Sequence, residues 1–116
     1  MDNAKLGELI SVTTRNRMSA IVRVQTRDEL DAALELCPPV IELGKRDTDS
    51  GVLDVAHIEA LRAAIPSTNR VLLYNRLRSF DEAAAVAPLK PNAVLVSTAL
   101  LSEDDAIPRL REIFEK

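Results

Sequence analysis

The chain has 116 residues, of which 15 are Lys or Arg and 18 are Asp or Glu, giving a formal net charge of −3. This length fits one domain and is about half of what a complete eight-stranded α/β barrel needs. The two charge signs are interspersed, so neither a nucleic acid nor an anionic membrane is expected as a partner. The single cysteine, Cys37, the polar start and the lack of a run of about 20 apolar residues favour a reducing, cytoplasmic setting.

Helical and strand patterns alternate along the whole chain. Helices are expected where apolar residues recur every three or four positions, and strands where apolar runs lie between Gly, Pro and polar stretches. The expected helices cover 4–12, 28–36 and 55–65, the stretch from Ser79 to Pro88, and a last stretch from Ser102 through Phe114. The expected strands cover 20–24, 40–43, 69–74 and 93–97, and a polar stretch at 75–78 follows the third strand.

Capping residues support these helix starts. Thr26 and Asp54 each stand just before an amphipathic run, where their side-chain oxygens can accept the free N–H groups of the first turn. Ser79 with Glu82 three positions later forms an S-x-x-E capping box, and Ser102 with Asp105 is expected to open the last helix. The result is a short helix followed by four strand–helix units, which predicts an α/β domain over residues 1–116 with parallel, helix-covered strands.

The loops between these units carry recognisable motifs. The stretch VIELGKRDTDSGVLD at 40–54 aligns without a gap to V-I-G-I-N-N-R-D-L-K-T-F-x-V-D, and SAIVRVQ at 19–25 is similar to E-x-L-V-E-V-H. LYNRL at 73–77 and VLVSTALL at 94–101 match S-E-S-G-I and V-L-V-G-x-A-L-M in the same order. In these motifs the chain resembles the C-terminal half of indole-3-glycerol phosphate synthase, a TIM barrel of the ribulose-phosphate-binding superfamily. The resemblance implies a half (β/α)8 barrel with a short helix before it, and a carboxy-lyase of tryptophan biosynthesis as the family activity.

The same resemblance shows where the chain departs from the family. Positions that help to bind substrate, or that are phosphate-binding glycines in the family, are here Gly44, Tyr74, Arg76 and Ser97. The lysines and glutamate of the ring-closure chemistry belong to earlier strands of the barrel, which these 116 residues do not contain. General acid–base catalysis needs a titratable group within hydrogen-bond reach of the reacting atom. We therefore assign no catalytic residue, and expect no catalysis of the family reaction by this chain alone.

Eight residues near the ends of the strands are candidates for binding. Arginines and helix N-termini both favour anions, so four residues are candidates for phosphate, and four others are candidates by position alone. The anion candidates are Arg76, Arg78, Ser97 and Thr98, and the loop-end candidates are Lys45, Arg46, Tyr74 and Asn75. In the alternative interpretation Arg76 and Arg78 fill or border the position of the family's phosphate site, because a side chain in place of glycine blocks the close backbone approach. Tyr74 is then a half-buried packing residue at the end of its strand. His57 and Cys37 lack the partners that a metal site or nucleophilic dyad requires, so both are read as structural, and no metal or cofactor is expected.

Four parallel strands cannot close a small barrel, so both edge strands should present unpaired backbone groups. The concave face should expose Ile21, Leu72 and either Val94 or Val96, and the resemblance turns Arg23 and Glu42 toward it from neighbouring strands. Because an unpaired buried charge is costly, we expect either a cross-strand ion pair between these two residues or solvent entering this face. Two copies could close an eight-stranded barrel, and this homodimer is the favoured expectation. The alternatives are an open sheet with helices on both sides, covered in part by the first helix, and a different partner that supplies the other half.

These observations favour a non-catalytic half-barrel that self-associates or serves as an interaction protein. One alternative is a binding module for a phosphorylated small molecule or for an enzyme of the tryptophan pathway. Another is a subunit that completes a lyase of this type together with a second chain.

Overall fold

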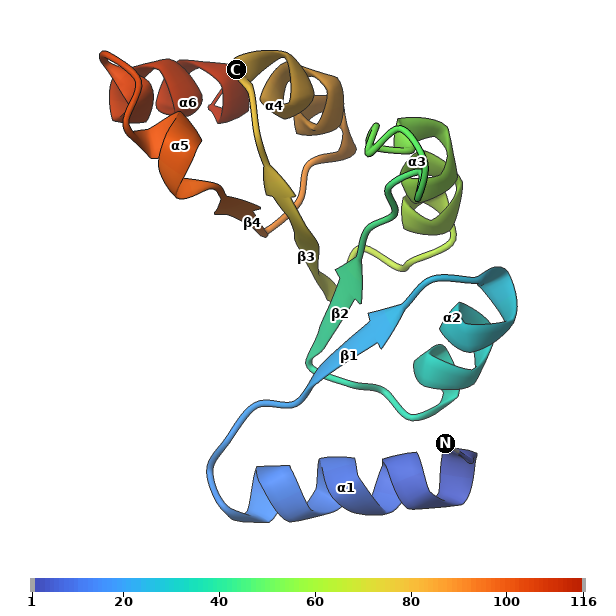
Figure 1. The fold of residues 1–116 in the computed structure, drawn as a ribbon. Coiled ribbons are helices and arrows are strands. Elements are labelled where there is room, and N and C mark those ends of the chain that lie inside the picture. Colours follow the sequence, from blue (N-terminus) through green and yellow to red (C-terminus); the bar gives the residue numbers. More distant parts are fainter. Residues whose placement is uncertain (1, 116) are drawn as a thin grey trace.

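The computed structural model describes residues 2–115, with the backbone alone at positions 74 and 75. Helices and strands alternate as the sequence predicts (Figure 1). Among the described residues, no helix combines the length and the apolar character that crossing a bilayer would demand. The elements are α1 (Asn3–Arg15), β1 (Ile21–Val24), α2 (Arg27–Glu35), β2 (Val40–Leu43), α3 (Val55–Ala63), β3 (Arg70–Leu77), α4 (Phe80–Val86), the 3₁₀ turn η1 (Ala87–Leu89), β4 (Ala93–Val96), α5 (Thr98–Leu101) and α6 (Ala106–Phe114).

The four strands form one parallel sheet in the order β1-β2-β3-β4. Each strand therefore lies beside the one that precedes it in the chain, with a helix in every crossover, which is the arrangement of successive strands in a (β/α)8 barrel. The fold is a half-barrel of four βα units with one helix before them (Figure 1).

One face of the sheet carries the hydrophobic core. Val24, Ile41 and Val71 are at most 1% exposed and belong to a single cluster with the buried side chains of the helices. Because side chains alternate across a strand, the residues between them point to the opposite face. The helices that contribute to this cluster therefore cover one side of the sheet, rather than both sides as in the open-sheet alternative.

No helix within residues 2–115 covers the opposite face, here called the open face. Ile21 at one edge strand is 53% exposed and Leu95 at the other is 40% exposed, while Leu72 between them is half-buried. The expectation of Val94 or Val96 on this face was wrong. The register pairs Leu73 with Val94, so these two valines share the helix-covered face with the buried Leu73, and they pack against the core.

Three predicted helix caps are confirmed. The Thr26 hydroxyl accepts the Glu29 N–H while the Glu29 carboxylate accepts the Thr26 N–H, a complete capping box. Asp54 accepts the His57 N–H at 3.1 Å, and the Ser79 hydroxyl accepts the Glu82 N–H at 3.1 Å. These caps fix the start of each helix directly after its loop, and so they set where the loop residues lie.

Three elements differ from the sequence-based prediction. Helix α1 continues to Arg15, and in its last turns the hydroxyls of Thr13 and Thr14 donate to the Ile10 carbonyl oxygen at 2.8 and 2.9 Å. Strand β3 continues to Leu77, so 75–77 belong to the strand rather than to a polar stretch after it. The last helix is divided: α5 ends at Leu101, Ser102 is its C-cap, and α6 starts after Asp105.

Candidate functional site

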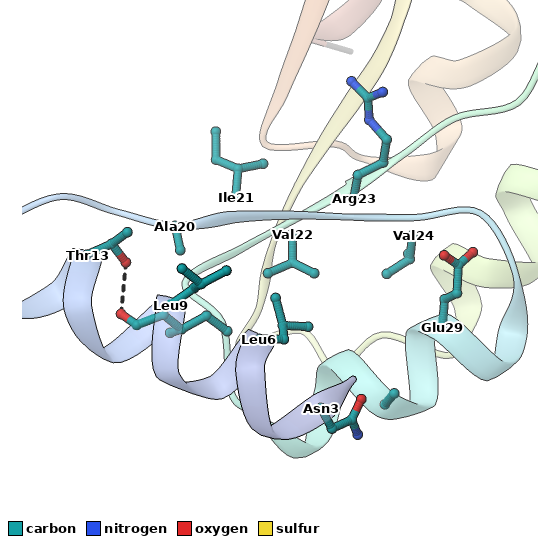
Figure 2. Close-up of a pocket in the computed structure, with 12 residues that line it drawn as sticks. Asn3, Leu6, Leu9, Thr13, Ala20, Ile21, Val22, Arg23, Val24 and Glu29 are labelled. Carbon is teal, nitrogen blue, oxygen red and sulfur yellow. Dashed lines mark hydrogen bonds between the residues drawn. The ribbon is translucent and has the colours of Figure 1, made fainter. Parts of the chain in front are cut away.

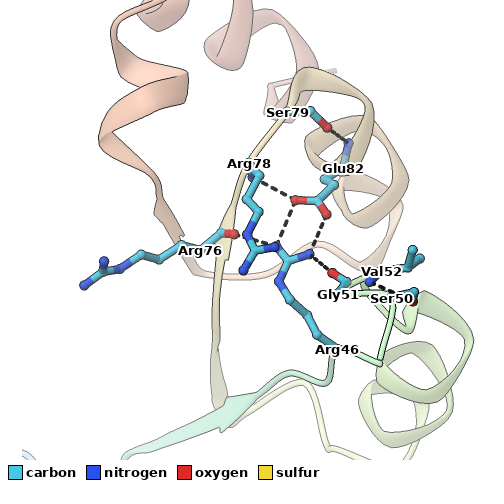
Figure 3. Close-up of polar contacts among 8 residues, drawn as sticks. All are labelled: Arg46, Ser50, Gly51, Val52, Arg76, Arg78, Ser79 and Glu82. Carbon is cyan, nitrogen blue, oxygen red and sulfur yellow. Dashed lines mark hydrogen bonds and ion pairs between the residues drawn. The ribbon is translucent and has the colours of Figure 1, made fainter. Parts of the chain in front are cut away.

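The carboxyl ends of the parallel strands meet at one edge of the sheet, where α/β folds usually bind ligands. Here side-chain hydrogen bonds join the loop after β2 to the end of β3 and to the first turn of α4, and these contacts form the centre of the candidate site (Figure 3). Strand β3 carries an irregularity at this edge: its pairing shifts from Leu73 opposite Val94 to Leu77 opposite Val96. Four steps along β3 thus oppose two steps along β4, which is a bulge of the kind that re-aims side chains.

The loop after β2 is folded by its own polar groups. The Asp47 carboxylate accepts the N–H groups of Asp49 and Ser50 at 2.9 and 2.8 Å, forming an Asx turn. These hydrogen bonds, from Ser50 first and then from Asp49, hold the pKa of Asp47 below its ordinary value. Gly51 adopts a positive φ of 72°, which its lack of a side chain permits. The loop then returns alongside itself through an antiparallel bridge between Arg46 and Leu53.

Arg46 leaves this loop and binds Glu82 in the first turn of α4. Its Nη1 lies 2.6 Å from Oε2 of Glu82 and its Nη2 lies 2.9 Å from Oε1, which is a bidentate ion pair. The two side chains are 11% and 21% exposed. The guanidinium also donates to the carbonyl oxygens of Gly51 at 3.0 Å and Arg76 at 2.6 Å. Arg46 therefore ties the β2–α3 loop to the end of β3 and to α4.

The pair shifts the pKa of both partners in the direction that favours charge. The hydrogen bond from Arg46 lowers the pKa of the Glu82 carboxyl, although partial burial opposes it, and the Arg78 N–H at 2.7 Å lowers it further. The same hydrogen bond raises the pKa of Arg46. A carboxylate held ionised in this way is a poor general acid near neutral pH, because a general acid must carry a proton there.

The anion candidates do not converge on one point. Figure 3 shows the Arg76 side chain pointing away from the Arg46–Glu82 pair, whereas Arg78 lies next to the pair. A methyl group placed on Gly51 would meet Nη1 of Arg78 at 3.4 Å, so this arginine lies against the β2–α3 loop. Ser97 is the N-cap of α5, where its hydroxyl accepts the Leu100 N–H at 3.2 Å, and Thr98 is exposed at the first position of that four-residue helix.

The remaining candidates have different positions. Lys45 is exposed, and its carbonyl oxygen accepts the Asp54 N–H at 2.8 Å, so its backbone closes the loop while its side chain faces solvent. Arg46, a candidate by position, is held in the ion pair described above. The side chains of Tyr74 and Asn75 lie outside the described part of the structure. The binding roles assigned to these residues stay predictions.

His57 links two loops at the same edge. Its Nε2 lies 2.6 Å from the Gln25 carbonyl oxygen, which joins the start of α3 to the end of β1. This contact supports the structural role expected for the histidine. Cys37 is an exposed free thiol after α2 with a φ of 50°. Within residues 2–115 no three His, Cys, Asp or Glu side chains gather as a metal site requires.

The predicted ion pair between neighbouring strands is confirmed. The register places Arg23 of β1 beside Glu42 of β2, and Nε of the arginine lies 3.1 Å from Oε2 of the glutamate. Figure 2 shows Ile21 and Arg23 pointing away from α1, while Val22 and Val24 point toward it. The pair therefore lies on the open face, with 59% of the arginine and 14% of the glutamate side chain exposed. Solvent reaches this face, as the sequence-based alternative also expected.

Sequence reasoning missed the partner of Glu82. The S-x-x-E pattern placed Glu82 in a capping box with Ser79, and the serine half of that box is present. The carboxylate, however, accepts the N–H of Arg78 and binds Arg46, which lies 36 positions earlier. No local pattern reports a contact over that separation. Only the parallel register of β2 and β3 brings the two loops together.

Comparisons with known proteins agree with this fold. A family model described as indole-3-glycerol phosphate synthase matches residues 1–113. The enzyme of that name from Dehalococcoides mccartyi strain 195 is 32% identical over 109 residues, which make up 94% of this chain and 42% of that protein. The one from Roseiflexus sp. strain RS-1 is 31% identical over 115 residues, 97% of this chain and 43% of that protein. The chain thus spans about two fifths of the length of these relatives.

Two solved structures share the fold at low sequence identity. A chain in the crystal structure of the Amycolatopsis orientalis BexX/CysO complex matches 98% of this chain and 48% of its own length, with a TM-score of 0.67 and 19% identity. A native KDPGal structure matches with a TM-score of 0.60 and 18% identity, over 94% of this chain and 52% of its own. With four successive parallel βα units and a family model that matches 113 residues, this chain belongs to the indole-3-glycerol phosphate synthase family.

Proposed function

We propose that this chain is a non-catalytic half-barrel that works by association with another protein unit. The observation that carries the proposal is the open face, where Ile21 and Leu95 at the two edge strands are 53% and 40% exposed. Strands at the edge of a sheet, beside exposed apolar side chains, are the features that pair with further strands. Association would cover both at once.

The polar groups at the carboxyl edge support the non-catalytic part of the proposal. The two carboxylates with shifted pKa values, Glu82 and Asp47, are both held ionised by hydrogen bonds within the chain. The Arg46 guanidinium has its donors directed to Glu82 and to two carbonyl oxygens. A proton donor poised near neutral pH would need the opposite shift. These groups serve to join loops.

Two measurements test the proposal. Sedimentation equilibrium of the 116-residue chain between 1 and 100 µM should show reversible association, in which case the mass rises with concentration; a homodimer is the sequence-based expectation for its simplest form. Incubation with the substrate of the family enzyme should yield no indole-3-glycerol phosphate above the rate without protein. Formation of that product by the purified chain would contradict the proposed loss of catalysis. A chain that stays monomeric at every concentration in this range would contradict self-association.

Binding of a phosphorylated small molecule is the second candidate. It is supported by two exposed arginines at the edge of the sheet, Arg76 and Arg78. Ligand that binds the folded chain raises its melting temperature in proportion to the logarithm of ligand concentration above Kd. Titration with inorganic phosphate and with ribulose 5-phosphate should therefore raise Tm, and should do so less in the Arg78→Gln variant. An unchanged Tm at 10 mM of either ligand would remove this candidate.

A further inference from the structure

Helix α1 is the only α-helix within residues 2–115 that has no buried residue. It lies beyond β1 at the outer edge of the sheet (Figure 1), across a groove of about 530 Å³ that is here called the β1 groove. Leu6 points toward β1 (Figure 2), and Leu6 and Ile10 are half-buried against the core. A helix in a protein owes most of its stability to the apolar face that it buries, and that of α1 is only partly covered.

Polar contacts do not add to this attachment. Among the described residues, no hydrogen bond or ion pair joins α1 to the sheet or to another helix. The hydrogen bonds of α1 run within the helix or to the residues next to it, as from the Lys5 N–H to the Asp2 carboxylate at 2.8 Å. Apart from its chain connection to β1, the helix is therefore held by apolar contacts alone.

Helix α6 at the opposite edge of the sheet is held more firmly. It also overhangs a groove, with a volume of about 330 Å³, beside β4. However, Ala106 and Leu110 of α6 are buried, and the Arg109 guanidinium lies 3.6 Å from the centre of the Phe80 ring in α4. A cation over an aromatic ring is attracted to it. Of the two edge helices, α1 is thus the one that can leave its groove without breaking a polar contact.

The connection from α1 to β1 is short and contains a strained residue. Arg17 adopts a φ of 60°, a backbone conformation that residues with a side chain rarely adopt. A short connection under strain favours exchange of the attached element between two copies, because the strain is released when the connection extends. Residues 16–20 reach at most about 17 Å when extended, so an exchanged helix stays close to the copy from which it comes.

We propose that two copies of this chain exchange α1, so that α1 of each copy packs in the β1 groove of the other. This rests on the proposed function and names the contact through which the chain self-associates. The helix fits the groove of a second copy because that groove is identical to the one in which the structure shows it. Leu6 and Ile10 would make the same apolar contacts as before, while Arg17 could leave its strained conformation.

Gly7 reports which copy's groove α1 occupies. A methyl group placed on Gly7 would meet Cδ2 of Leu36 at 3.3 Å, so these two positions are neighbours when α1 is docked. Leu36 is the C-cap residue of α2 and is half-buried. Cysteines at the two positions are therefore close enough for a short bismaleimide to link them. The link lies within one chain when α1 packs on its own sheet, and it joins two chains when α1 is exchanged.

The test uses the full chain with Gly7→Cys and Leu36→Cys, and with Cys37→Ser to remove the native exposed thiol. Equal amounts of unlabelled and isotope-labelled chain are mixed in urea, refolded together at about 100 µM and treated with the bismaleimide. Mass spectrometry of the digested product then counts the links that join an unlabelled chain to a labelled one. Exchange predicts such mixed links between positions 7 and 36, because α1 of one chain then lies in the groove of another.

The matched control carries Val52→Cys in place of Gly7→Cys. Val52 is 63% exposed in the β2–α3 loop, so its thiol is accessible, but exchange of α1 does not bring it to Leu36 at the other end of β2. Mixed links in the test chain should exceed those in the control at least about tenfold, since only a docked α1 raises the local concentration of the two thiols. Circular dichroism and Tm verify that both variants fold.

A longer connection gives a second measurement without introduced cysteines. Inserting Gly-Ser-Gly-Ser after Ser19 in the otherwise unchanged chain removes the strain from the form in which α1 packs on its own sheet. Because lengthened connections disfavour exchange, the insertion should raise the Kd of self-association at least about threefold in sedimentation equilibrium.

The outcomes separate this inference from the proposed function. A chain that self-associates but shows no more mixed links than the control would overturn the inference and leave association standing. Self-association with an unchanged Kd after the insertion would also overturn it, because the copies would then meet through another surface. A chain that stays monomeric and gives no mixed links would overturn the inference and self-association together.

Discussion

Removing the Glu82 carboxylate should lower the free energy of unfolding by more than the loss of an exposed ion pair does. Glu82→Ala deletes both hydrogen bonds to Arg46, at 2.6 and 2.9 Å, and the 2.7 Å bond from the Arg78 N–H. Arg46, only 11% exposed, would keep its charge and lose its counterion. Breaking a fully buried pair costs about 3–5 kcal/mol and an exposed pair about 0.2–1 kcal/mol. For this intermediate exposure we expect a loss of about 2–3 kcal/mol in the free energy of unfolding.

The matched control is an exposed ion pair in the same chain. Arg27 and Asp31 in α2 are separated by one helical turn, and their atoms lie 2.9 Å apart with 64% and 56% of the side chains exposed. Asp31→Ala should cost at most about 0.5 kcal/mol. Urea denaturation followed by circular dichroism at pH 7 measures both variants. Equal m-values are required, so that the difference in midpoint reports stability alone.

The pH dependence gives a second readout. The folded-state pKa of Glu82 lies below its ordinary value of 4.5, so the ionised pair stabilises the fold fully above about pH 4.5. That stabilisation is lost as the pH falls through the folded-state pKa. The stability difference between the wild type and Glu82→Ala should therefore shrink on acidification below pH 4.5. The reasoning is refuted if Glu82→Ala costs no more than Asp31→Ala at pH 7.

Three further variants test other parts of the structure in the same denaturation assay. Arg23→Leu removes the partner of Glu42 on the open face and should cost about 1 kcal/mol; an unchanged midpoint would speak against a stabilising pair. Gly51→Ala places a side chain at a φ of 72° and should cost about 1 kcal/mol, with no loss if the loop relaxes. Arg17→Gly should stabilise by about 0.5–1 kcal/mol, since Arg17 adopts a φ of 60° in a Schellman motif closed by the Met18 N–H on the Thr13 oxygen. A lower midpoint for this variant would argue against that motif in solution.

Local patterns predicted most of the secondary structure. The strand Val40–Leu43 begins after the prolines and ends at Gly44, and the caps at Thr26 and Asp54 start their helices. These signals act within about four residues, through backbone preferences and hydrogen bonds that neighbouring positions make with one another. The cross-strand pair of Arg23 and Glu42 was also predictable, because the family resemblance supplied the strand register.

Predictions of element boundaries that depend on contacts beyond the nearest neighbours in the sequence were less accurate. The third strand was expected to end at position 74, but pairing of Leu77 with Val96 across the bulge keeps 75–77 in β3. Ser102 with Asp105 resembled a helix start, whereas Ser102 ends α5 by donating its hydroxyl to the Thr98 carbonyl oxygen. In each case a contact with another element, or with the preceding turn, outweighed the local preference.

The amino-acid sequence by itself determined the order of the strands, the caps of α2, α3 and α4, and the side of the first three strands that turns inward. All of these follow from spacing and from contacts between near neighbours in the chain. Tertiary structure alone decided that Arg46 is bound to Glu82 rather than exposed at the edge of the sheet. It also decided that α1 and α6 overhang grooves at opposite edges. The physical reason is that both depend on the parallel register, which brings together loops and edges that lie far apart in the sequence.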